Sequence, residues 1–189
     1  MKLKFFMLSS ILLFARACDF YSTSLWFFDN PKGETNPLYR FFGVGWTGLI
    51  IANVFIVSLL IYAFYYYSFK YQPTRHSTAK NLPDFVSELY FQEKGRFFQI
   101  FYKIPTNKSA FFAHTGYVMV RIVIVASFIA TFHNFCQYYN VPFYNTFRDF
   151  VGRPLYVIYG LLFLTSVYFT YRLWRKEFKQ TIDSYSKER

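Results

Sequence analysis

The chain has 189 residues, of which 54% are hydrophobic and 25% aromatic, and its formal net charge is +11. Long apolar stretches at this composition are typical of membrane proteins and argue against an ordinary soluble domain. In a soluble protein the basic excess would suggest a nucleic-acid partner. Here the Lys and Arg residues lie where a membrane protein keeps its cytoplasmic loops, so we expect no nucleic acid.

Sequence motifs for metals, cofactors and disulfides are not evident. The two cysteines, Cys18 and Cys136, both lie inside apolar runs, and their spacing fits neither a disulfide framework nor a zinc site. His114 is expected at the membrane interface, and His133 lies near the opposite end of the same helix. Because a haem or metal would need two histidines at matching depth, the sequence predicts no metal and no cofactor.

The first apolar run, residues 5–28, is long enough to cross a bilayer as a helix. Its apolar character continues beyond a signal-peptide length, so we expect an uncleaved helix. Arg16 lies near its middle, and helical spacing places Asp19, Ser22 and Thr23 on the same face. An ionisable residue within a span is expensive and marks a functional-site hypothesis. Two interpretations stay open, a structural ion pair between Arg16 and Asp19 or a substrate or ion site.

A short loop leads to a second predicted helix, about residues 41–69. Asn36 followed by Pro37 suits a helix start, while Glu34 and Asn36 could also hang over the Asp19 face. Small residues at Gly45 and Gly48 predict close packing of the first helix at this point. Deep in this helix, Asn53 is expected to donate a helix–helix hydrogen bond.

Residues 70–112 form the one sizeable polar segment. Within it, residues 81–104 combine apolar faces with basic residues, which predicts a helical segment lying on the inner membrane surface. Phe85 and Phe98 are expected to face lipid. A soluble hairpin that binds a partner is the alternative.

Two further spans complete the predicted bundle. The helix at about 113–138 carries a small and polar face with Ser127, Thr131, His133 and Asn134, which we expect to meet the Asp19 face of the first helix. After an outer loop, the last helix spans about 153–174 and is followed by a basic tail, 175–189.

The predicted fold is therefore all-α: an integral membrane four-helix bundle, one membrane domain over 1–189, with a cytoplasmic interfacial helical segment between helices two and three. The proposed inner segments (the first four residues, 70–112 and 172–189) hold 15 Lys and Arg residues, against 4 in the outer loops 29–40 and 139–153. Positive charge near short loops stays inside. We expect both termini in the cytoplasm, in a bacterial inner membrane.

Two short motifs carry a resemblance. The stretch Asp19-Phe20-Tyr21-Ser22-Thr23 fits Asp-x-x-(Ser/Thr)-Thr, and Glu34-Thr35-Asn36-Pro37 fits Glu-x-Asn-Pro. In these first fifty residues the chain resembles small polytopic bacterial and archaeal membrane proteins of unknown function, of the Bacteroidetes type. The resemblance implies a helical membrane protein and no particular activity.

The sequence leaves three functions open. The leading one is a non-enzymatic scaffold or accessory subunit with a buried Arg/Asp cluster, whose Asp19 should be sealed and paired. An intramembrane enzyme acting through Asp19 on a lipid-like or membrane-embedded substrate should show an open polar cavity, and a transporter or channel component should show water access from both sides. The lipid bilayer is the expected partner, with a membrane-protein partner or a homo-oligomer as further contacts. The candidate polar cluster comprises Arg16, Asp19, Ser22, Thr23, Glu34, Asn36, His133 and Asn134.

Overall fold

The computed structural model describes residues 2–29, 45–73, 77 and 79–187. Every regular element among them is helical. The elements are α1 (Lys2–Asp29), α3 (Trp46–Tyr65) with the π-helical turn η2 (Tyr66–Lys70), α4 (Leu82–Phe91), the 3-10 turn η3 (Phe97–Phe101), α5 (Lys108–Tyr138), α6 (Pro142–Val151) and α7 (Pro154–Lys187).

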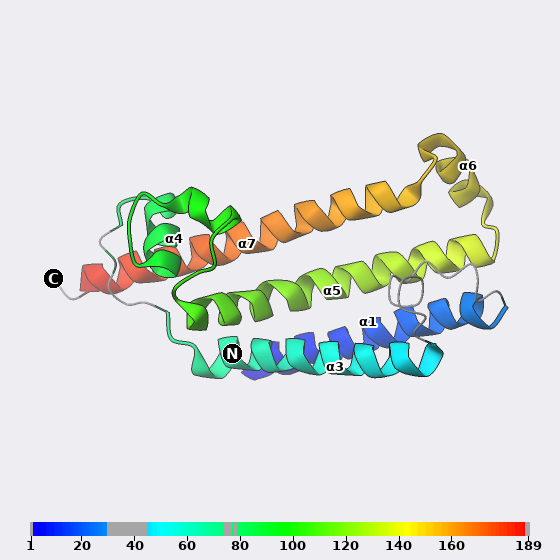
Figure 1. Cartoon of the computed structure of the whole chain (residues 1–189), viewed down its shortest axis with the longest axis horizontal. Coiled ribbons are helices and arrows are strands. Elements are labelled where there is room, and N and C mark those ends of the chain that lie inside the picture. The colour runs from blue at the N-terminus through cyan, green and yellow to red at the C-terminus, as the bar shows by residue number, and fades with distance from the viewer. Residues whose placement is uncertain (1, 30–44, 74–76, 78, 188–189) are drawn as a thin grey trace.

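The long helices α1, α3, α5 and α7 extend along the length of the molecule (Figure 1). Helix α5 is central, because it contacts α1, α3 and α7. The N-terminus and α4 lie near one end, where α4 packs beside the C-terminal part of α7, and α6 lies at the other end. We call these the α4 end and the α6 end of the bundle.

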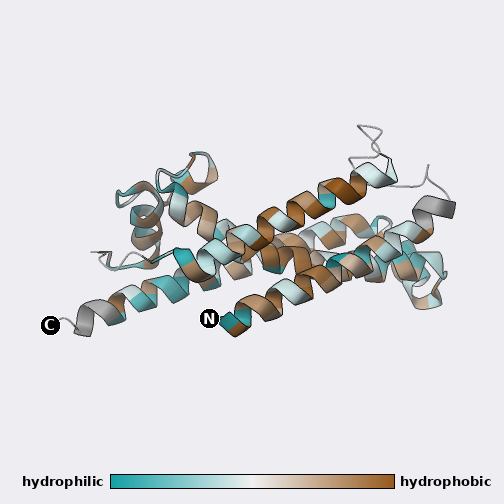
Figure 2. Cartoon of the chain, turned by 90° about the horizontal axis from the view of Figure 1, so that it is seen from below, coloured by the Kyte–Doolittle hydropathy of each residue, from teal (hydrophilic) through white to brown (hydrophobic). Residues whose placement is uncertain are grey.

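Three helical segments are long and apolar enough to cross a membrane: 46–70, 108–138 and 154–183. The chain is thus a helical membrane protein. Apolar residues cover much of the long helices, and hydrophilic residues gather towards the C-terminal end of α7 (Figure 2). Helix α1 has 28 residues but is not among these three segments of the described part of the chain.

Local sequence explains where several helices begin. The side chain of Asn81 accepts a hydrogen bond from the Asp84 backbone N–H at 2.9 Å, and Asn107 caps α5 in the same way. Such caps satisfy donors that have no partner within the helix. Helices α6 and α7 both begin with proline, whose missing N–H is harmless at that position.

A very close helix contact lies between α3 and α5. A Cβ atom added to Gly116 would lie 2.3 Å from the backbone carbonyl carbon of Ala63, so only glycine fits there. A Cβ added to Gly45 would meet nothing within 4 Å, and α1 packs mainly along α5. The predicted close packing is therefore not found at Gly45 among the described residues, although α1 does contact α3, where Arg16 bonds to Asn53 and Phe20 meets Trp46.

The predicted end of the last helix at 174 is also wrong, because α7 continues to Lys187. The reason is tertiary: Leu173, Glu177 and Thr181, spaced four residues apart, are all buried near α4. The helix therefore has a packed face where the sequence indicates only a basic tail. The outer loop 139–153 likewise contains a helix, α6.

The segment 81–104 divides into two parts. Phe85 is 1% exposed and packs on Phe178 of α7, so the expectation that Phe85 faces lipid is wrong. Phe98, by contrast, is 75% exposed. Helix α4 thus belongs to the protein core, while η3 packs on this core with Phe97 and Ile100 and leaves Phe98 and Phe101 exposed.

Candidate functional site

Arg16 is held by three helices. Its Nη1 donates to Asp19 Oδ2, one turn further along α1, and to Ser127 Oγ of α5 at 3.1 Å. Its Nε and Nη2 both donate to Asn53 Oδ1 of α3, at 3.0 and 2.7 Å. The expected ion pair of Arg16 with Asp19 is present, and so is a helix–helix hydrogen bond at Asn53. Asn53 accepts this bond and does not donate it as predicted, because its partner Arg16 carries only donors, and the charge of this donor makes the bond stronger than a neutral one.

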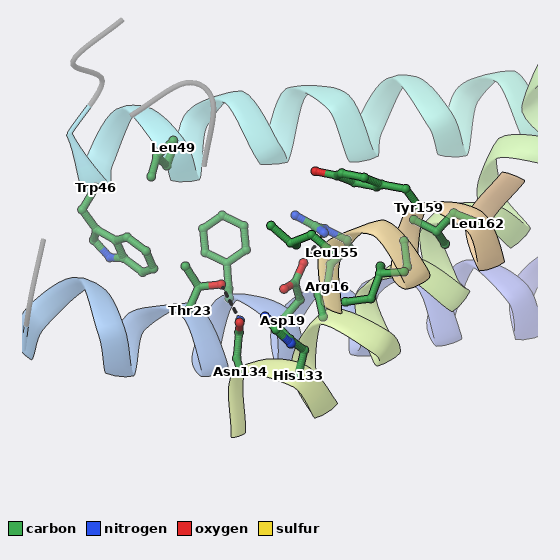
Figure 3. Close-up of a pocket in the computed structure, with 14 residues that line it drawn as sticks. Arg16, Asp19, Thr23, Trp46, Leu49, His133, Asn134, Leu155, Tyr159 and Leu162 are labelled. Carbon is green, nitrogen blue, oxygen red and sulfur yellow. Dashed lines mark hydrogen bonds and ion pairs between the residues drawn. The ribbon is translucent and has the colours of Figure 1, made fainter. Parts of the chain in front are cut away.

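A second set of hydrogen bonds extends the same network towards the α6 end. Asn134 Nδ2 of α5 donates to Ser22 Oγ at 3.1 Å and to Thr23 Oγ1 at 3.3 Å (Figure 3). Ser22 Oγ in turn donates to the Asp19 backbone carbonyl at 2.9 Å. The polar faces of α1 and α5 therefore meet, as the helical spacing of their residues predicts.

The network lines a cavity of about 300 Å³ that the described residues only partly enclose. Arg16, Asp19, Thr23, His133 and Asn134 supply its polar groups, together with the hydroxyl-bearing Tyr159 of α7. Figure 3 shows these side chains between α1, α3, α5 and α7. The remaining lining is apolar or aromatic: Phe20, Trp46, Leu49, Ala126, Ala130, Leu155, Ile158 and Leu162.

His133 is bonded away from the ion pair. Its Nδ1 is hydrogen-bonded to the hydroxyl of Tyr144, which α6 places against the end of α5. Burial raises the pKa of Tyr144, so this hydroxyl stays protonated at neutral pH and can donate to the ring nitrogen. The histidine thus lines the cavity with its ring oriented by α6, a contact that the sequence did not indicate.

Two of the sequence-predicted site residues, Glu34 and Asn36, lie outside the described residues. The second motif of the resemblance falls there too. Within the described parts of the chain, no group of three His, Cys, Asp or Glu residues is arranged so that it could hold a metal ion.

A second buried polar network, near the α4 end, was missed by sequence reasoning. His114 Nε2 lies 3.0 Å from Glu177 Oε1, and His114 Nδ1 lies 2.7 Å from the Tyr90 hydroxyl. Trp174 Nε1 donates to Tyr90 at 3.2 Å, and the Tyr71 hydroxyl donates to Glu177 Oε2 at 3.3 Å. With the His114 proton on Nε2, every donor in this hydrogen-bond network has an acceptor.

This second network connects α4, α5 and α7. The side chains of His114 and Glu177 are almost fully buried there. Burial, and for Tyr71 the nearby Glu177 carboxylate, raises the pKa of Tyr71 and Tyr90 well above the usual tyrosine range. Both hydroxyls therefore remain donors at neutral pH. His114 is enclosed by protein near the α4 end, and the signal that sequence analysis overlooked is Glu177 within the mainly basic C-terminal segment.

The comparisons with known proteins give no match: no protein family, curated protein or solved structure is similar to the chain at a significant level. Function must therefore be argued from the cavity and its residues.

Proposed function

We propose that the chain is a four-span, non-enzymatic membrane protein that binds an amphipathic, lipid-like molecule in the Arg16–Asp19 cavity. One observation carries this proposal: the ion pair is partnered from three helices and still lines a cavity of about 300 Å³. A pair that served only to join helices would need no such space. A concave, largely apolar pocket with a few convergent polar groups is the usual form of a ligand site.

Helix α1 is the fourth span in this proposal. Its 28 residues extend about 42 Å at 1.5 Å per residue, longer than the ~30 Å hydrocarbon core. It packs along α5, which is itself long and apolar enough to span. The two charges that would lie inside the bilayer are paired with each other, which reduces the cost of placing them there.

The α4 end would face the cytoplasm of a bacterial cell, with the cavity in the outer half of the inner membrane. Support comes from the distribution of Lys and Arg, since 15 lie in the proposed inner segments and 4 in the outer loops. Reporter fusions after Ser77 and at the C-terminus should both report cytoplasm. A periplasmic signal from either fusion would overturn this orientation.

The interfacial segment is narrower in this proposal than residues 81–104. Only the turn around η3 remains, where Phe98, Phe101, Tyr102 and Ile104 are each at least 75% exposed. Lys103 lies among them. Exposed aromatic side chains beside a basic one suit the membrane–water interface. We name this group, Phe98 to Ile104, the aromatic tip.

The occupant of the cavity follows from its lining. Leu155, Ile158 and Leu162 of α7 present an apolar wall, while Arg16 and Asp19 present both signs of charge. A ligand with a hydrocarbon part and a hydroxyl or zwitterionic head matches both surfaces. The cavity reaches Asp19, as expected of an intramembrane enzyme and not of a sealed scaffold, but among the described residues that line it Asp19 is the sole carboxylate, so these residues assemble no pair of carboxylates for acid–base catalysis.

The test uses a substitution that fills the cavity. Ala130→Phe places a ring in the lining, whereas Ala17→Phe makes the same change on an exposed part of α1. After extraction in lipid discs, native mass spectrometry should find a small amphipathic molecule on the parent protein and on Ala17→Phe. Ala130→Phe should have lost it. Equal loading of all three proteins, or none on the parent, would contradict the proposal.

An accessory subunit is the second candidate, favoured by the exposure of the α7 wall. Tyr159 lines the cavity yet is 61% exposed, so a helix of a partner protein could complete the same wall. A photo-crosslinking side chain at Tyr159 separates the two cases. Crosslinks to one membrane protein in stoichiometric yield would favour the subunit, and crosslinks to lipid would favour the ligand site.

A further inference from the structure

A second cavity, of about 290 Å³, lies between α5, α7 and the η3 turn. It does not share a lining residue with the Arg16–Asp19 cavity. Its walls are mostly apolar, with Val118, Met119 and Ile122 on α5 and Leu173 and Trp174 on α7. We call it the α5–α7 slot.

The slot is elongated along the helices. On α5 its lining runs from Phe111 to Ile122, a rise of about 16 Å, which is about half of the ~30 Å hydrocarbon core. Both flanking helices are long and apolar enough to span a membrane. In the proposed placement of the chain in a membrane, lipid hydrocarbon would surround the slot, and the length of the slot suits one acyl chain of a single leaflet.

The mouth of the slot lies at the α4 end, beside the aromatic tip. Phe101 lines the slot and is 75% exposed, so its ring reaches from the wall into the surroundings. Trp174 donates its N–H to Tyr90, which satisfies the polar atom of the indole and leaves its ring surface as wall. The mouth is thus formed by aromatic residues typical of headgroup depth.

Two exposed lysines lie within three residues of side chains that line the slot. Lys103 follows η3 by two residues, Lys108 is the first residue of α5, and both side chains are exposed. In the described segment 93–108, the single acidic residue is Glu93, and it is already paired with Arg96. Two uncompensated lysines next to an apolar slot favour an anionic headgroup over a zwitterionic one.

We propose that the α5–α7 slot binds one anionic phospholipid, with an acyl chain along α5 and α7 and the phosphate at Lys103 and Lys108. The inference rests on the proposed placement of the α4 end at an anionic leaflet, and on no property of the Arg16–Asp19 cavity. Bound lipid would seal the space between α5 and α7 and fix the aromatic tip against the membrane.

Trp174 provides a local probe, because it is one of three tryptophans and the one that lines the slot. In a protein carrying Trp26→Phe and Trp46→Phe, the remaining fluorescence reports this position. The protein is reconstituted into phosphatidylcholine vesicles that contain a low mole fraction of phosphatidylglycerol with brominated acyl chains. We expect quenching above that given by the same fraction of brominated phosphatidylcholine, and saturation as the fraction rises.

Two sets of variants decide whether the excess quenching by brominated phosphatidylglycerol comes from lipid bound in the slot. Ser166→Phe and, independently, Thr170→Leu add volume to the lining, and each should remove the excess quenching. Lys103→Gln with Lys108→Gln should remove the preference for phosphatidylglycerol, while Lys179→Gln, an exposed lysine on α7, should keep it. Helix content by circular dichroism establishes that each variant is folded.

The outcomes separate a site from general lipid contact. Excess quenching that is lost in a folded slot variant supports the proposal. Equal quenching by both brominated lipids in the parent, or excess quenching that survives both slot variants, means that Trp174 meets annular lipid only and overturns it. Because the vesicles expose the protein to both leaflets alike, a wrong orientation would appear in the reporter fusions and not in this assay.

Discussion

Removing Asp19 tests whether the Arg16 network holds the bundle together. In Asp19→Ala, Arg16 loses its counter-charge but keeps its hydrogen bonds to Asn53 and Ser127. Breaking a fully buried ion pair on one side costs about 3–5 kcal/mol. The Arg16 and Asp19 side chains are 23% and 14% exposed, and two partners remain, so we expect a lower cost. An estimate of about 2–3 kcal/mol follows.

The double variant Arg16→Ala/Asp19→Ala should be milder than Asp19→Ala alone. The double variant leaves neither member of the ion pair unpaired. Its main loss is the Arg16 donor to the side-chain oxygen of Asn53, which should cost about 1–2 kcal/mol of stability. At about 2–4 °C per kcal/mol for a chain of this size, Asp19→Ala should lower Tm by about 5–10 °C and the double variant by about half of that.

The measurement is thermal unfolding of the parent, both single variants and the double variant in the same lipid discs, analysed as a double-mutant cycle. Asp19→Asn is the matched control, because its amide oxygen can still accept from Arg16 and the fall in Tm should be small. Additive single effects, or four proteins with the same Tm, would refute the reasoning. If Asp19→Asn is stable but no longer carries the co-purifying molecule, Asp19 contacts the ligand.

Three further predictions concern other parts of the chain. Gly116→Ala should destabilise the protein by several kcal/mol in chemical unfolding, because its Cβ would overlap the α3 backbone, whereas Gly160→Ala on α7 has open space and should be neutral or slightly stabilising. Glu177→Ala should lower the free energy of unfolding by about 3 kcal/mol, because it leaves His114 and the Tyr71 hydroxyl without their buried partner. Glu177→Gln should recover most of this loss, and an equal loss in both variants would show that charge, and not hydrogen bonding, matters there. A polarity-sensitive fluorophore at position 98, in a Phe98→Cys variant, should report a lipid environment in vesicles, and a water-like emission maximum there would remove the aromatic tip from the membrane.

Several of these features follow from the sequence, because they depend on local composition and helical period. Apolar runs of spanning length predict the helical membrane class, which three helices confirm. A period of 3.6 residues places Arg16 and Asp19 on one face, and a charge there needs a partner, so their pairing could be foreseen. The same period aligns Ser127 and Asn134 on α5, and both bond to α1.

Tertiary structure decided what periodicity cannot express, namely which faces meet and where space remains. Sequence analysis singled out Gly45 and Gly48 as packing sites and not Gly116, yet it is Gly116 that the α3–α5 crossing brings against a backbone. Phe85 carries the same apolar signal as Phe98, yet the extension of α7 to Lys187 buries the first and leaves the second exposed. The pairing of Glu177 with a histidine 63 positions earlier arises because antiparallel α5 and α7 bring distant residues to one depth. Cavities arise for the same reason: they are the gaps left where helices diverge, and no single segment of sequence specifies the distance between two helices.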